Sequence, residues 1–393
     1  MRILLISHTC QSATEGQPKA ECLARIPGVD LRVMVPDRWK HYGKWRSAEV
    51  PAAPDYHYEV GKVAMPWMGP AQFYLHWYPQ LRADLESFRP DIIDLWEEPW
   101  GLGSAHTCWL RNRILPSARI ITETEQNILK RLPPPFERFR SYTLKHADAA
   151  VARSVEALAV LRAKGFEGPA RVVPNGVDVE LFRPLDREQC RRELGLRQFT
   201  VGYVGRLVDE KGLMDLMDAV AVAPPTVDLL YVGDGPLQHT LQTRAAELGL
   251  NQRVKVLPAK PQRELPRIMN AVDVLALPSR TTGRWKEQFG RVLIEAHACE
   301  TPVIASDSGA IPEVVGEGGI VCCERNPASL AAAIREFQNH PQRRRQLGVE
   351  GRRQVLEKYT WQRVAEQMYR YYRETLEVPP IASASITPQI DAA

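Results

Sequence analysis

Residues 277–309 read LPSRTTGRWKEQFGRVLIEAHACETPVIASDSG, and this stretch decides how the rest of the chain is interpreted. The pattern predicts a loop that contains Glu287, a helix that begins near Gly290 and contains Glu295, and a strand at Val303–Ala305. Amide groups in the first turn of such a helix can hold a phosphate, and the two carboxylates can accept hydrogen bonds from paired hydroxyls of a sugar or a ribose. Taken alone, Glu287 could equally cap the helix, and Glu295 could be a solvated helix position.

Short apolar runs alternate with longer amphipathic segments along the whole chain. The runs typical of strands are Ile3–Ser7, Leu31–Val35, Ile92–Leu95, Ile120–Thr122, Ala149–Ala152, Arg171–Pro174, Thr200–Tyr203, Leu229–Val232, Val254–Leu257, Val274–Ala276, Val303–Ala305 and Gly319–Val321. Helical spacing is found at Phe73–Phe88, Arg138–His146, Leu213–Val222, Leu330–Phe337 and Gln342–Glu377. This alternation favours the α/β class, with parallel sheets covered by helices on both faces.

The chain is expected to form two domains, because its 393 residues exceed what one hydrophobic core usually serves. The sequence PNGVDVELFRP at 174–184 predicts a linker, since Pro-Asn-Gly favours a turn. We expect an N-terminal domain at 1–175, a C-terminal domain at 176–360, a helix at 361–377 that packs back on the N-terminal domain, and a disordered tail at 378–393. Ligands of such sheets bind at the carboxyl ends of the strands, so the expected site is a cleft between the domains.

Composition argues against several classes of protein. The 51 Lys and Arg nearly balance the 47 Asp and Glu, which argues against a protein that mainly holds nucleic acid through its phosphates. The seven cysteines form no Cys-x-x-Cys pair, the histidines show no metal spacing and no Asp-x-Asp site is evident, so we expect reduced thiols and no bound metal. No full Gly-x-Gly-x-x-Gly follows a strand, which argues against a nicotinamide-dependent dehydrogenase.

Hydropathy indicates a cytoplasmic protein. No apolar stretch approaches the ~20 residues that span a bilayer. The first apolar run, within MRILLISHT, is too short for a signal peptide and is followed at once by polar residues, so it is better interpreted as a strand.

A glycine turn follows the predicted strand at 200–204. There GRLVDEKG, residues 205–212, places Arg206 and Lys211 near the end of the strand, and two cations at such a turn suit a diphosphate. Asp209 and Glu210 offer the alternative of surface salt bridges.

Another glycine turn, YVGDGP at 231–236, is a weak signal by itself. In order and spacing, however, GRLVDEKG, GDGP, LPSR and WKEQFGRVLIEA resemble glycosyltransferase family 4, and PNGVD at 174–178 is similar to that family's junction between domains. The resemblance covers the C-terminal half well. It implies the GT-B fold, in which two Rossmann-like domains face a central cleft.

The resemblance also implies an activity. The family transfers a sugar from a nucleoside-diphosphate sugar to an acceptor hydroxyl and retains the anomeric configuration of the sugar. For this chain we expect a UDP-sugar or a GDP-sugar as co-substrate, no permanently bound cofactor, and a glycan, lipid-linked or small-molecule acceptor. In the mechanism of the family the departing phosphate helps to take the acceptor's proton, so no protein base is required.

The resemblance assigns roles to residues of this chain. Glu287 is expected to contact the transferred sugar near the reaction centre, and Glu295 to hold the ribose hydroxyls. Arg206 and Lys211 are expected to bind the diphosphate, where fixed cations stabilise the charge that develops on the leaving group without a metal ion. The other expected donor contacts come from Gly205, Gly233, Gly235, Phe289, Gly290 and Arg291.

The N-terminal half departs from the family pattern. Many relatives have a glycine-rich loop after the first strand, but residues 7–21 here contain only Gly16. His8 in this segment either faces the cleft or is a structural histidine. Where many relatives carry a histidine, this chain has TETEQN, so Glu125 and Asn127 are candidate contacts to the sugar or the acceptor, as is Glu98 after another strand. The alternative for these glutamates is a hydrated turn.

Three stretches combine aromatic and basic residues: RWKHYGKWR at 38–46, MPWMGPAQFYLHWYPQL at 65–81 and LKRLPPPFERFR at 129–140. They suit peripheral contact with the inner face of a membrane, or else packing between loops, or a surface for stacking sugars. Two other functions stay open as well. One is a different GT-B enzyme, such as an epimerase or a phosphorylase, and the other is a non-catalytic partner subunit that binds a nucleotide sugar.

Overall fold

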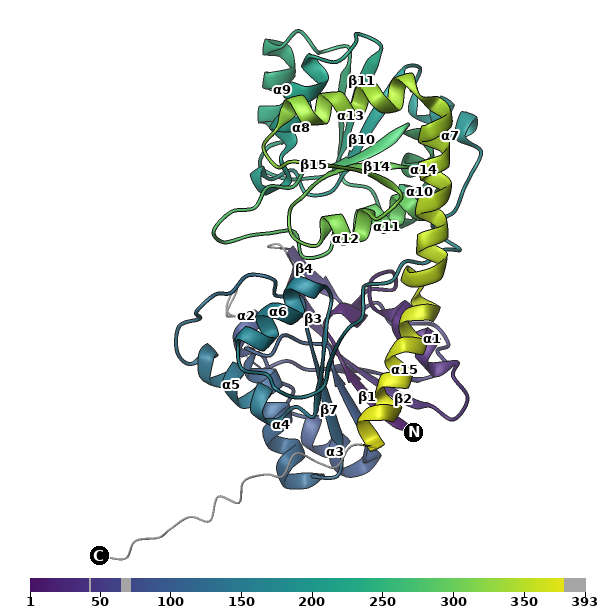
Figure 1. Cartoon of the computed structure of the whole chain (residues 1–393). Coiled ribbons are helices and arrows are strands. Elements are labelled where there is room, and N and C mark those ends of the chain that lie inside the picture. Colours follow the sequence, from purple (N-terminus) through teal and green to yellow (C-terminus); the bar gives the residue numbers. More distant parts are fainter. Residues whose placement is uncertain (42–43, 65–71, 378–393) are drawn as a thin grey trace, which may run out of the picture.

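Two α/β domains make up the computed structural model, which describes residues 1–41, 44–64 and 72–377 (Figure 1). Each domain is built on one parallel sheet, so the predicted α/β class is confirmed. The predicted tail at 378–393 lies outside the described residues, as do parts of the aromatic stretches at 38–46 and 65–81.

The N-terminal sheet has seven strands in the order β5-β2-β1-β6-β7-β8-β9, and every neighbouring pair is parallel. Successive side chains of its central strand point to opposite faces, so Ile3 and Leu5 enter one apolar cluster and Leu4 and Ile6 enter another. The strands are β1 (Arg2–Ile6), β2 (Asp30–Pro36), β5 (His57–Gly61), β6 (Ile92–Leu95), β7 (Arg119–Thr124), β8 (Ala149–Ala152) and β9 (Ala170–Val172).

The helices of this domain cover both faces of the sheet (Figure 1). The prediction of one helix at Phe73–Phe88 was wrong, because residues 76–80 are not helical and Pro79 has no amide to donate to a helix. A hairpin of β3 (Arg38–His41) and β4 (Lys44–Ser47) was not predicted. The helices are α1 (Gln17–Ala24), α2 (Gln72–Leu75), α3 (Leu81–Phe88), α4 (Leu102–Ile114), α5 (Phe136–His146) and α6 (Val155–Ala163).

The C-terminal sheet has six parallel strands in the order β12-β11-β10-β13-β14-β15 and encloses one large apolar core with its helices. Its strands are β10 (Phe199–Val204), β11 (Val227–Val232), β12 (Val254–Leu257), β13 (Val274–Leu277), β14 (Val303–Ser306) and β15 (Gly319–Cys322). Its helices are α7 (Arg187–Leu194), α8 (Leu213–Ala221), α9 (Gln238–Glu247), α10 (Leu265–Ala271), α11 (Arg291–Ala298), α12 (Ile311–Val315), α13 (Pro327–Asn339) and α14 (Pro341–Gln354).

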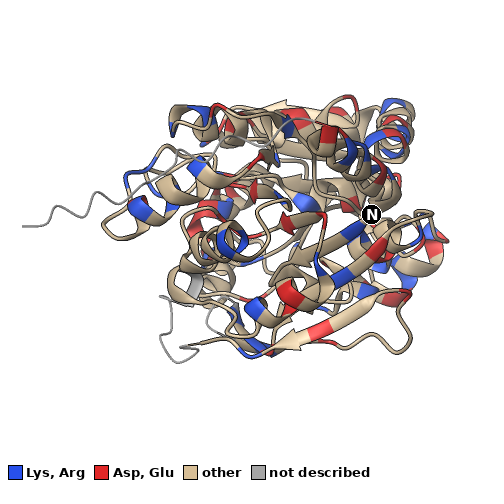
Figure 2. Ribbon diagram, turned by 90° about the horizontal axis from the view of Figure 1, so that it is seen from below, with Lys and Arg blue, Asp and Glu red and all other residues tan. Residues whose placement is uncertain are grey.

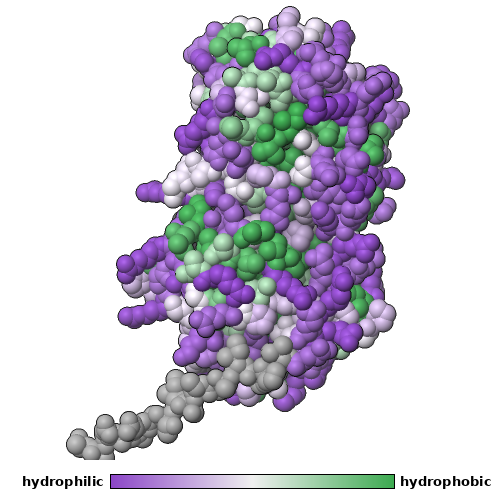
Figure 3. Space-filling view, viewed as in Figure 1, coloured by the Kyte–Doolittle hydropathy of each residue, from purple (hydrophilic) through white to green (hydrophobic). Residues whose placement is uncertain are grey.

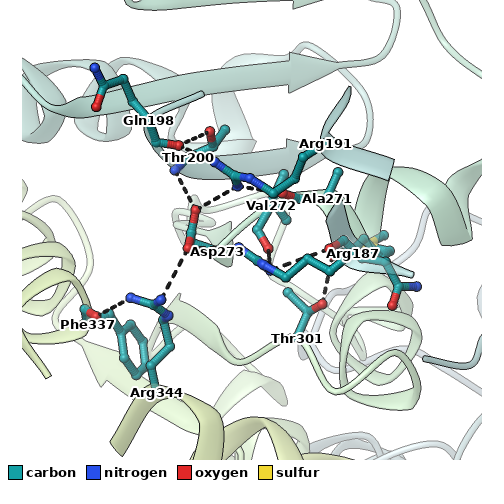
Figure 4. Close-up of polar contacts among 12 residues, drawn as sticks. Arg187, Arg191, Gln198, Thr200, Ala271, Val272, Asp273, Thr301, Phe337 and Arg344 are labelled. Carbon is teal, nitrogen blue, oxygen red and sulfur yellow. Dashed lines mark hydrogen bonds and ion pairs between the residues drawn. The ribbon is translucent and has the colours of Figure 1, made fainter. Parts of the chain in front are cut away.

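Asp273 anchors two helices at the amino edge of this sheet (Figure 4). Its carboxylate pairs with Arg187 at 2.8 Å, Arg191 at 3.0 Å and Arg344 at 3.3 Å. It also accepts the backbone amide of Thr200 at 2.9 Å. The arginines donate to backbone carbonyls as well, so the cluster joins α7 and α14 to the sheet.

The C-terminal helix α15 (Trp361–Glu377) returns the chain to the N-terminal domain (Figure 1). Its apolar side enters the same cluster as Ile3 and Leu5. A π-helical segment, Val355–Tyr359, precedes it, so the predicted helical region 342–377 is interrupted at Thr360. The amide of Val177 donates to the carbonyl of Tyr359 at 2.8 Å, and the two crossings between the domains therefore lie side by side.

A buried ionic network ties α15 to the sheet beneath it. Lys19 Nζ lies 2.8 Å from Asp94 and 2.6 Å from Glu123. Tyr372 of α15 donates to Asp94 at 2.6 Å, and Arg153 pairs with Glu123. All five side chains are at most 1% exposed, so each charge depends on its partners rather than on water.

Both sheets reverse their strand order beside the first strand of the domain. In the N-terminal sheet, β2 lies on one side of β1 and β6 on the other, and in the C-terminal sheet β11 and β13 flank β10 in the same way. In open parallel sheets, ligands bind outside the carboxyl ends of the strands at such a reversal. The loops after β1, β6, β10 and β13 are therefore where a site is expected.

Candidate functional site

Hydrogen bonds join the carboxyl edges of the two sheets across the domain junction. Asn127, after β7, donates from Nδ2 to the carbonyl of Glu287 at 2.7 Å. Gln288 donates to the carbonyl of Glu125 at 3.0 Å, and Lys130 to the carbonyl of Arg284 at 2.6 Å. The structure thus brings the N-terminal candidates Glu125 and Asn127 to the loop that carries Glu287.

Lys211 and Glu287 form an ion pair on the C-terminal side of the junction. Lys211 Nζ lies 2.5 Å from Glu287 Oε2, and Ser279, after β13, donates to the same oxygen at 2.8 Å. The Trp285 ring lies under the ammonium, with its centroid 4.9 Å from Nζ. Lys211 therefore pairs with neither Asp209 nor Glu210, and Glu287 accepts bonds from side chains instead of capping a helix.

The glycine turns after β10 and β11 press against each other. A Cβ atom at Gly233 would lie 1.8 Å from the carbonyl oxygen of Gly205, so no other residue fits there without moving the backbone. A Cβ atom at Gly235 would lie 2.3 Å from the carbonyl oxygen of Leu207. Arg206 leaves the first of these turns, and its carbonyl accepts the hydroxyl of Tyr203 at 2.7 Å. The two turns place Arg206 and Lys211 at the same edge of the sheet.

Helix α11 begins at the junction. Gly290 precedes it with a φ of +82°, a left-handed conformation that favours glycine. The amides at 290–292 come before the regular hydrogen bonds of the helix and can bind an anion. Arg291 lies 3.7 Å from Glu15 of the N-terminal domain, and Phe289 packs on Tyr359 with ring centroids 5.9 Å apart.

Glu295 lies one turn into α11 and is 8% exposed, so it is not a solvated helix position. Burial raises its pKa above the ordinary value, and Gln262 donates a long hydrogen bond to its carboxylate at 3.4 Å. A buried carboxylate with one weak donor can accept further hydrogen bonds from hydroxyls of a ligand.

Glu98 and Glu125 line the N-terminal side. Glu98 accepts the hydroxyl of Thr124 at 2.6 Å and the amide of Glu125 at 2.8 Å, and burial raises its pKa to about 8. Burial also raises the pKa of Glu125, whose side chain accepts a bond from Asn175 at 3.4 Å. Burial therefore favours the protonated form of Glu98 at neutral pH, which distinguishes this residue from a carboxylate in a hydrated turn.

Several residues of the site were not predicted from the sequence. They are Ser279 and Trp285 around the ion pair, Gln262 beside Glu295, and Glu15 and Gln288 between the domains. Ser279 and Trp285 lie inside the motifs LPSR and WKEQFG, close to Glu287 in the sequence. This closeness was the signal that could have indicated their place in the site.

A metal cluster and a membrane-spanning helix are both absent from the part of the chain that the structure describes. Within residues 1–41, 44–64 and 72–377, no cluster of three or more His, Cys, Asp or Glu could hold a metal ion. No helix in these ranges has the length and apolar character needed to cross a bilayer. All seven cysteines lack a disulfide partner. Figure 2 shows acidic and basic residues intermixed along the ribbon.

Known protein families match both halves of the chain. The model for glycosyl transferases group 1 matches residues 186–354, and the model for Glycosyltransferase Family 4 matches residues 20–181. A D-inositol 3-phosphate glycosyltransferase of Corynebacterium jeikeium is 32% identical over 318 residues, which cover 74% of this chain and 69% of that protein.

Other curated relatives match over shorter stretches. A D-inositol 3-phosphate glycosyltransferase of Segniliparus rotundus is 35% identical over 52% of this chain, and the match spans 47% of that relative's length. A GDP-mannose-dependent monoacylated alpha-(1-6)-phosphatidylinositol monomannoside mannosyltransferase of Corynebacterium glutamicum is 34% identical over 50% of this chain and 54% of its own.

Solved structures share the fold over nearly the whole chain. Sucrose-phosphate synthase from Thermosynechococcus elongatus superposes with a TM-score of 0.74 at 24% identity, covering 95% of this chain and 98% of that one. Anabaena HepE in complex with UDP superposes with a TM-score of 0.72 at 20% identity, covering 95% and 100%. The predicted fold of two Rossmann-like domains in the GT-B arrangement is confirmed.

Proposed function

Because this chain belongs to glycosyltransferase family 4, we propose that it is a retaining glycosyltransferase that uses a nucleoside-diphosphate sugar. The sugar passes to a hydroxyl group of a glycan, lipid-linked or small-molecule acceptor. The observation that carries the proposal is the convergence of Lys211, Glu287 and the start of α11 at one edge of the C-terminal sheet.

The diphosphate of the donor binds at this edge. Arg206 and Lys211 contact its oxygens, and the amides of Gly290 and Arg291 supply neutral donors. As the bond to the sugar breaks, negative charge accumulates on the diphosphate, and these fixed groups stabilise it without a metal ion. The nucleotide can approach the backbone closely at Gly205, Gly233 and Gly235, because glycine has no side chain. Phe289 closes the turn beneath the nucleotide.

Two carboxylates recognise hydroxyls of the donor. Glu295, which is buried and weakly bonded, holds the ribose. Glu287 pairs with Lys211, and exchanges part of this contact for a hydroxyl of the transferred sugar once the diphosphate engages Lys211. Glu287, Arg206 and Lys211 are therefore the proposed catalytic residues.

The acceptor binds against the N-terminal side. Glu98, Glu125 and Asn127 are the proposed contacts, with Asn127 also holding the Glu287 loop through its carbonyl. The names of two relatives mention an inositol phosphate and a phosphatidylinositol mannoside, so a polyol or a sugar on a lipid is the class of acceptor to try first.

Binding of the donor can be tested by thermal shift with UDP, GDP and ADP and their common sugars, first without metal and then with Mg²⁺. A ligand at a hundredfold excess over its dissociation constant adds about 2.7 kcal/mol of stability. We expect a shift with UDP or GDP that is lost in Arg206→Ala and Glu295→Ala. A protein that no nucleotide stabilises would contradict the proposal.

We further propose that the protein contacts membranes peripherally through the segment before α5. Leu129 is 60% exposed and is followed by Lys130 and Arg131, and Trp45 on the β3–β4 hairpin is 49% exposed. Figure 3 shows apolar patches on one face of the molecule within a largely hydrophilic surface. Wild-type protein should sediment with anionic vesicles at low salt, and Leu129→Glu should not; no sedimentation of the wild type would end this proposal.

A further inference from the structure

The loop that carries Glu287 lies beside the ends of the two strands that follow it in the sheet. The donor loop, residues 278–289, joins β13 to the start of α11 and contains no helix or strand. Strands β13, β14 and β15 are parallel neighbours in that order, so their carboxyl ends meet at one edge. Side chains that follow β14 and β15 can therefore reach the donor loop. The site proposed above uses none of these side chains.

Glu324 and Arg325, which follow β15, together bind every polar group of Thr281 in the donor loop. The amide and the hydroxyl of Thr281 each donate to Glu324, one to each carboxylate oxygen and both at 2.5 Å. The guanidinium of Arg325 donates to the carbonyl of Thr281 at 3.0 Å. Hydrogen bonds to a charged group are roughly twice as strong as those between neutral groups. Thr281 is therefore held more firmly than a loop residue that bonds only to neutral groups.

Further contacts fix the residues that hold Thr281. The hydroxyl of Ser308, a fully buried residue after β14, lies 2.9 Å from the hydroxyl of Thr281. Because Thr281 gives its one hydroxyl proton to Glu324, Ser308 is the donor in this contact. The amide of Glu324 donates to Asp307 at 2.8 Å. Arg325 has a φ of +55°, a left-handed conformation that a side chain disfavours, and strain of this kind is found where a local geometry is required.

A closed turn connects Thr281 to the ion pair of the site. The amide of Thr282 donates to the carbonyl of Trp285 at 2.8 Å, and the amide of Trp285 donates to the hydroxyl of Thr282 at 3.0 Å. The centroid of the Trp285 ring lies 4.9 Å from Nζ of Lys211, which pairs with Glu287. Since Thr281 directly precedes this turn, holding Thr281 fixes the position of the Trp285 ring beside the ion pair.

We propose that Glu324 and Arg325 are positioning residues for sugar transfer, and that they act by holding the base of the donor loop; this rests on the proposed function. Without these contacts, Glu287 meets the transferred sugar in a poorer geometry. A misplacement of about 1 Å can lower a rate by roughly 100-fold. The groups proposed to bind the diphosphate are Arg206, Lys211 and the amides at the start of α11. They lie outside the donor loop, so the affinity for the nucleotide should change little.

The test follows release of UDP from UDP-glucose and of GDP from GDP-mannose, with water as the acceptor, and binding of UDP and GDP. Glu324→Ala removes both acceptors of Thr281 and should lower kcat by about 10- to 100-fold, with KM and the dissociation constant within about threefold of the wild type. Thr281→Val removes only the hydroxyl contact and should lower kcat less. Glu317→Ala is the matched control, because Glu317 precedes β15 at its other end and pairs with Arg353 at 2.9 Å; its kcat should not change.

Arg325→Gly separates a positioning role from a purely structural one. Glycine adopts a φ of +55° without strain, so the midpoint of urea unfolding should not fall below that of the wild type. Its kcat should nevertheless fall several-fold, because the carbonyl of Thr281 loses its donor. Hydrogen exchange followed by mass spectrometry gives a readout that does not need turnover. In Glu324→Ala, the amides of residues 281–285 should exchange faster than in the wild type, and those of β10 and β11 should not.

The outcomes distinguish this inference from the proposed function. A Glu324→Ala protein with the wild-type kcat, or with wild-type exchange at residues 281–285, overturns the inference and leaves the proposed function standing. A loss of nucleotide affinity as large as the loss of kcat also overturns it, since the contacts would then serve binding rather than positioning. A wild-type protein that neither binds nor cleaves either donor overturns both.

Discussion

The ion pair between Lys211 and Glu287 gives the sharpest prediction about donor binding, because its two members should respond in opposite ways. Lys211→Gln removes the ammonium that meets the diphosphate. Glu287→Gln removes a carboxylate that competes for the ammonium, at 2.5 Å, and repels the diphosphate. The two substitutions break the same contact, so a purely structural ion pair would make them equivalent.

The expected magnitudes follow from the contacts. A hydrogen bond to a charged group contributes about 1.5–3 kcal/mol, so Lys211→Gln should weaken binding of the nucleoside diphosphate by ~10- to 100-fold. Removing one negative charge several ångströms from the diphosphate gains ~1 kcal/mol after screening, so Glu287→Gln should bind it ~5-fold more tightly. Turnover should nevertheless fall in both variants.

Isothermal titration with UDP and GDP at low ionic strength measures both effects. Lys286→Gln is the matched control, because Lys286 lies next to Glu287 in the same loop but pairs with Glu156 at 2.7 Å. Its dissociation constant should stay within about twofold of the wild type. Equal weakening by Lys211→Gln and Glu287→Gln would refute the reasoning and leave a structural ion pair.

Three further predictions concern stability, each measured by urea unfolding. Lys19→Met leaves Asp94 and Glu123 short of a buried partner and should cost about 3–5 kcal/mol; a loss below ~1 kcal/mol would contradict the network. The pKa of Glu98 is about 8 in the folded state against 4.5 unfolded, so its contribution to the free energy of unfolding falls as pH rises between these values. The stability of Glu98→Gln relative to the wild type should therefore increase by about 2 kcal/mol from pH 5 to 7.5, after allowance for partial exposure. A difference that stays constant with pH would contradict this. Burial lowers the pKa of His297 to about 4 against 6.5 unfolded, so the wild type should lose about 2 kcal/mol between pH 6.5 and 5, a loss that His297→Leu should not show.

The C-terminal half could be interpreted from the sequence because its chemistry follows from local patterns. A glycine before an amphipathic segment predicted the start of α11, and the placement of Glu287 before the helix and Glu295 within it needed nothing from distant residues. The partner of Lys211 was different. Glu287 is 76 residues away, whereas the adjacent Asp209 turns towards Arg280 at 3.4 Å. The acidic residues nearest to Lys211 in the sequence are therefore not its partners. Asp209 and Lys211 lie in one short 3₁₀ helix, and their side chains leave it in different directions.

The N-terminal half was less predictable for physical reasons. Strand β5 lies at the sheet edge with only Gly61 buried, so it lacks the apolar run that marks central strands. The raised pKa of Glu98 arises from burial, which spacing along the chain does not reveal. His8 and Glu97 are 89 residues apart, and only the register of β1 against β6 brings them together.

The most direct test of the central claim is a ¹H NMR time course of the purified protein with the nucleotide sugar that stabilises it and a polyol or glycolipid acceptor. The account predicts that nucleoside diphosphate appears together with a glycosylated product whose first anomeric signal has the configuration of the donor. Glu287→Gln, which should still bind the nucleotide, should give neither signal. Formation of a sugar 1-phosphate, conversion of the donor to its epimer, or tight donor binding with no turnover on any acceptor would contradict the account.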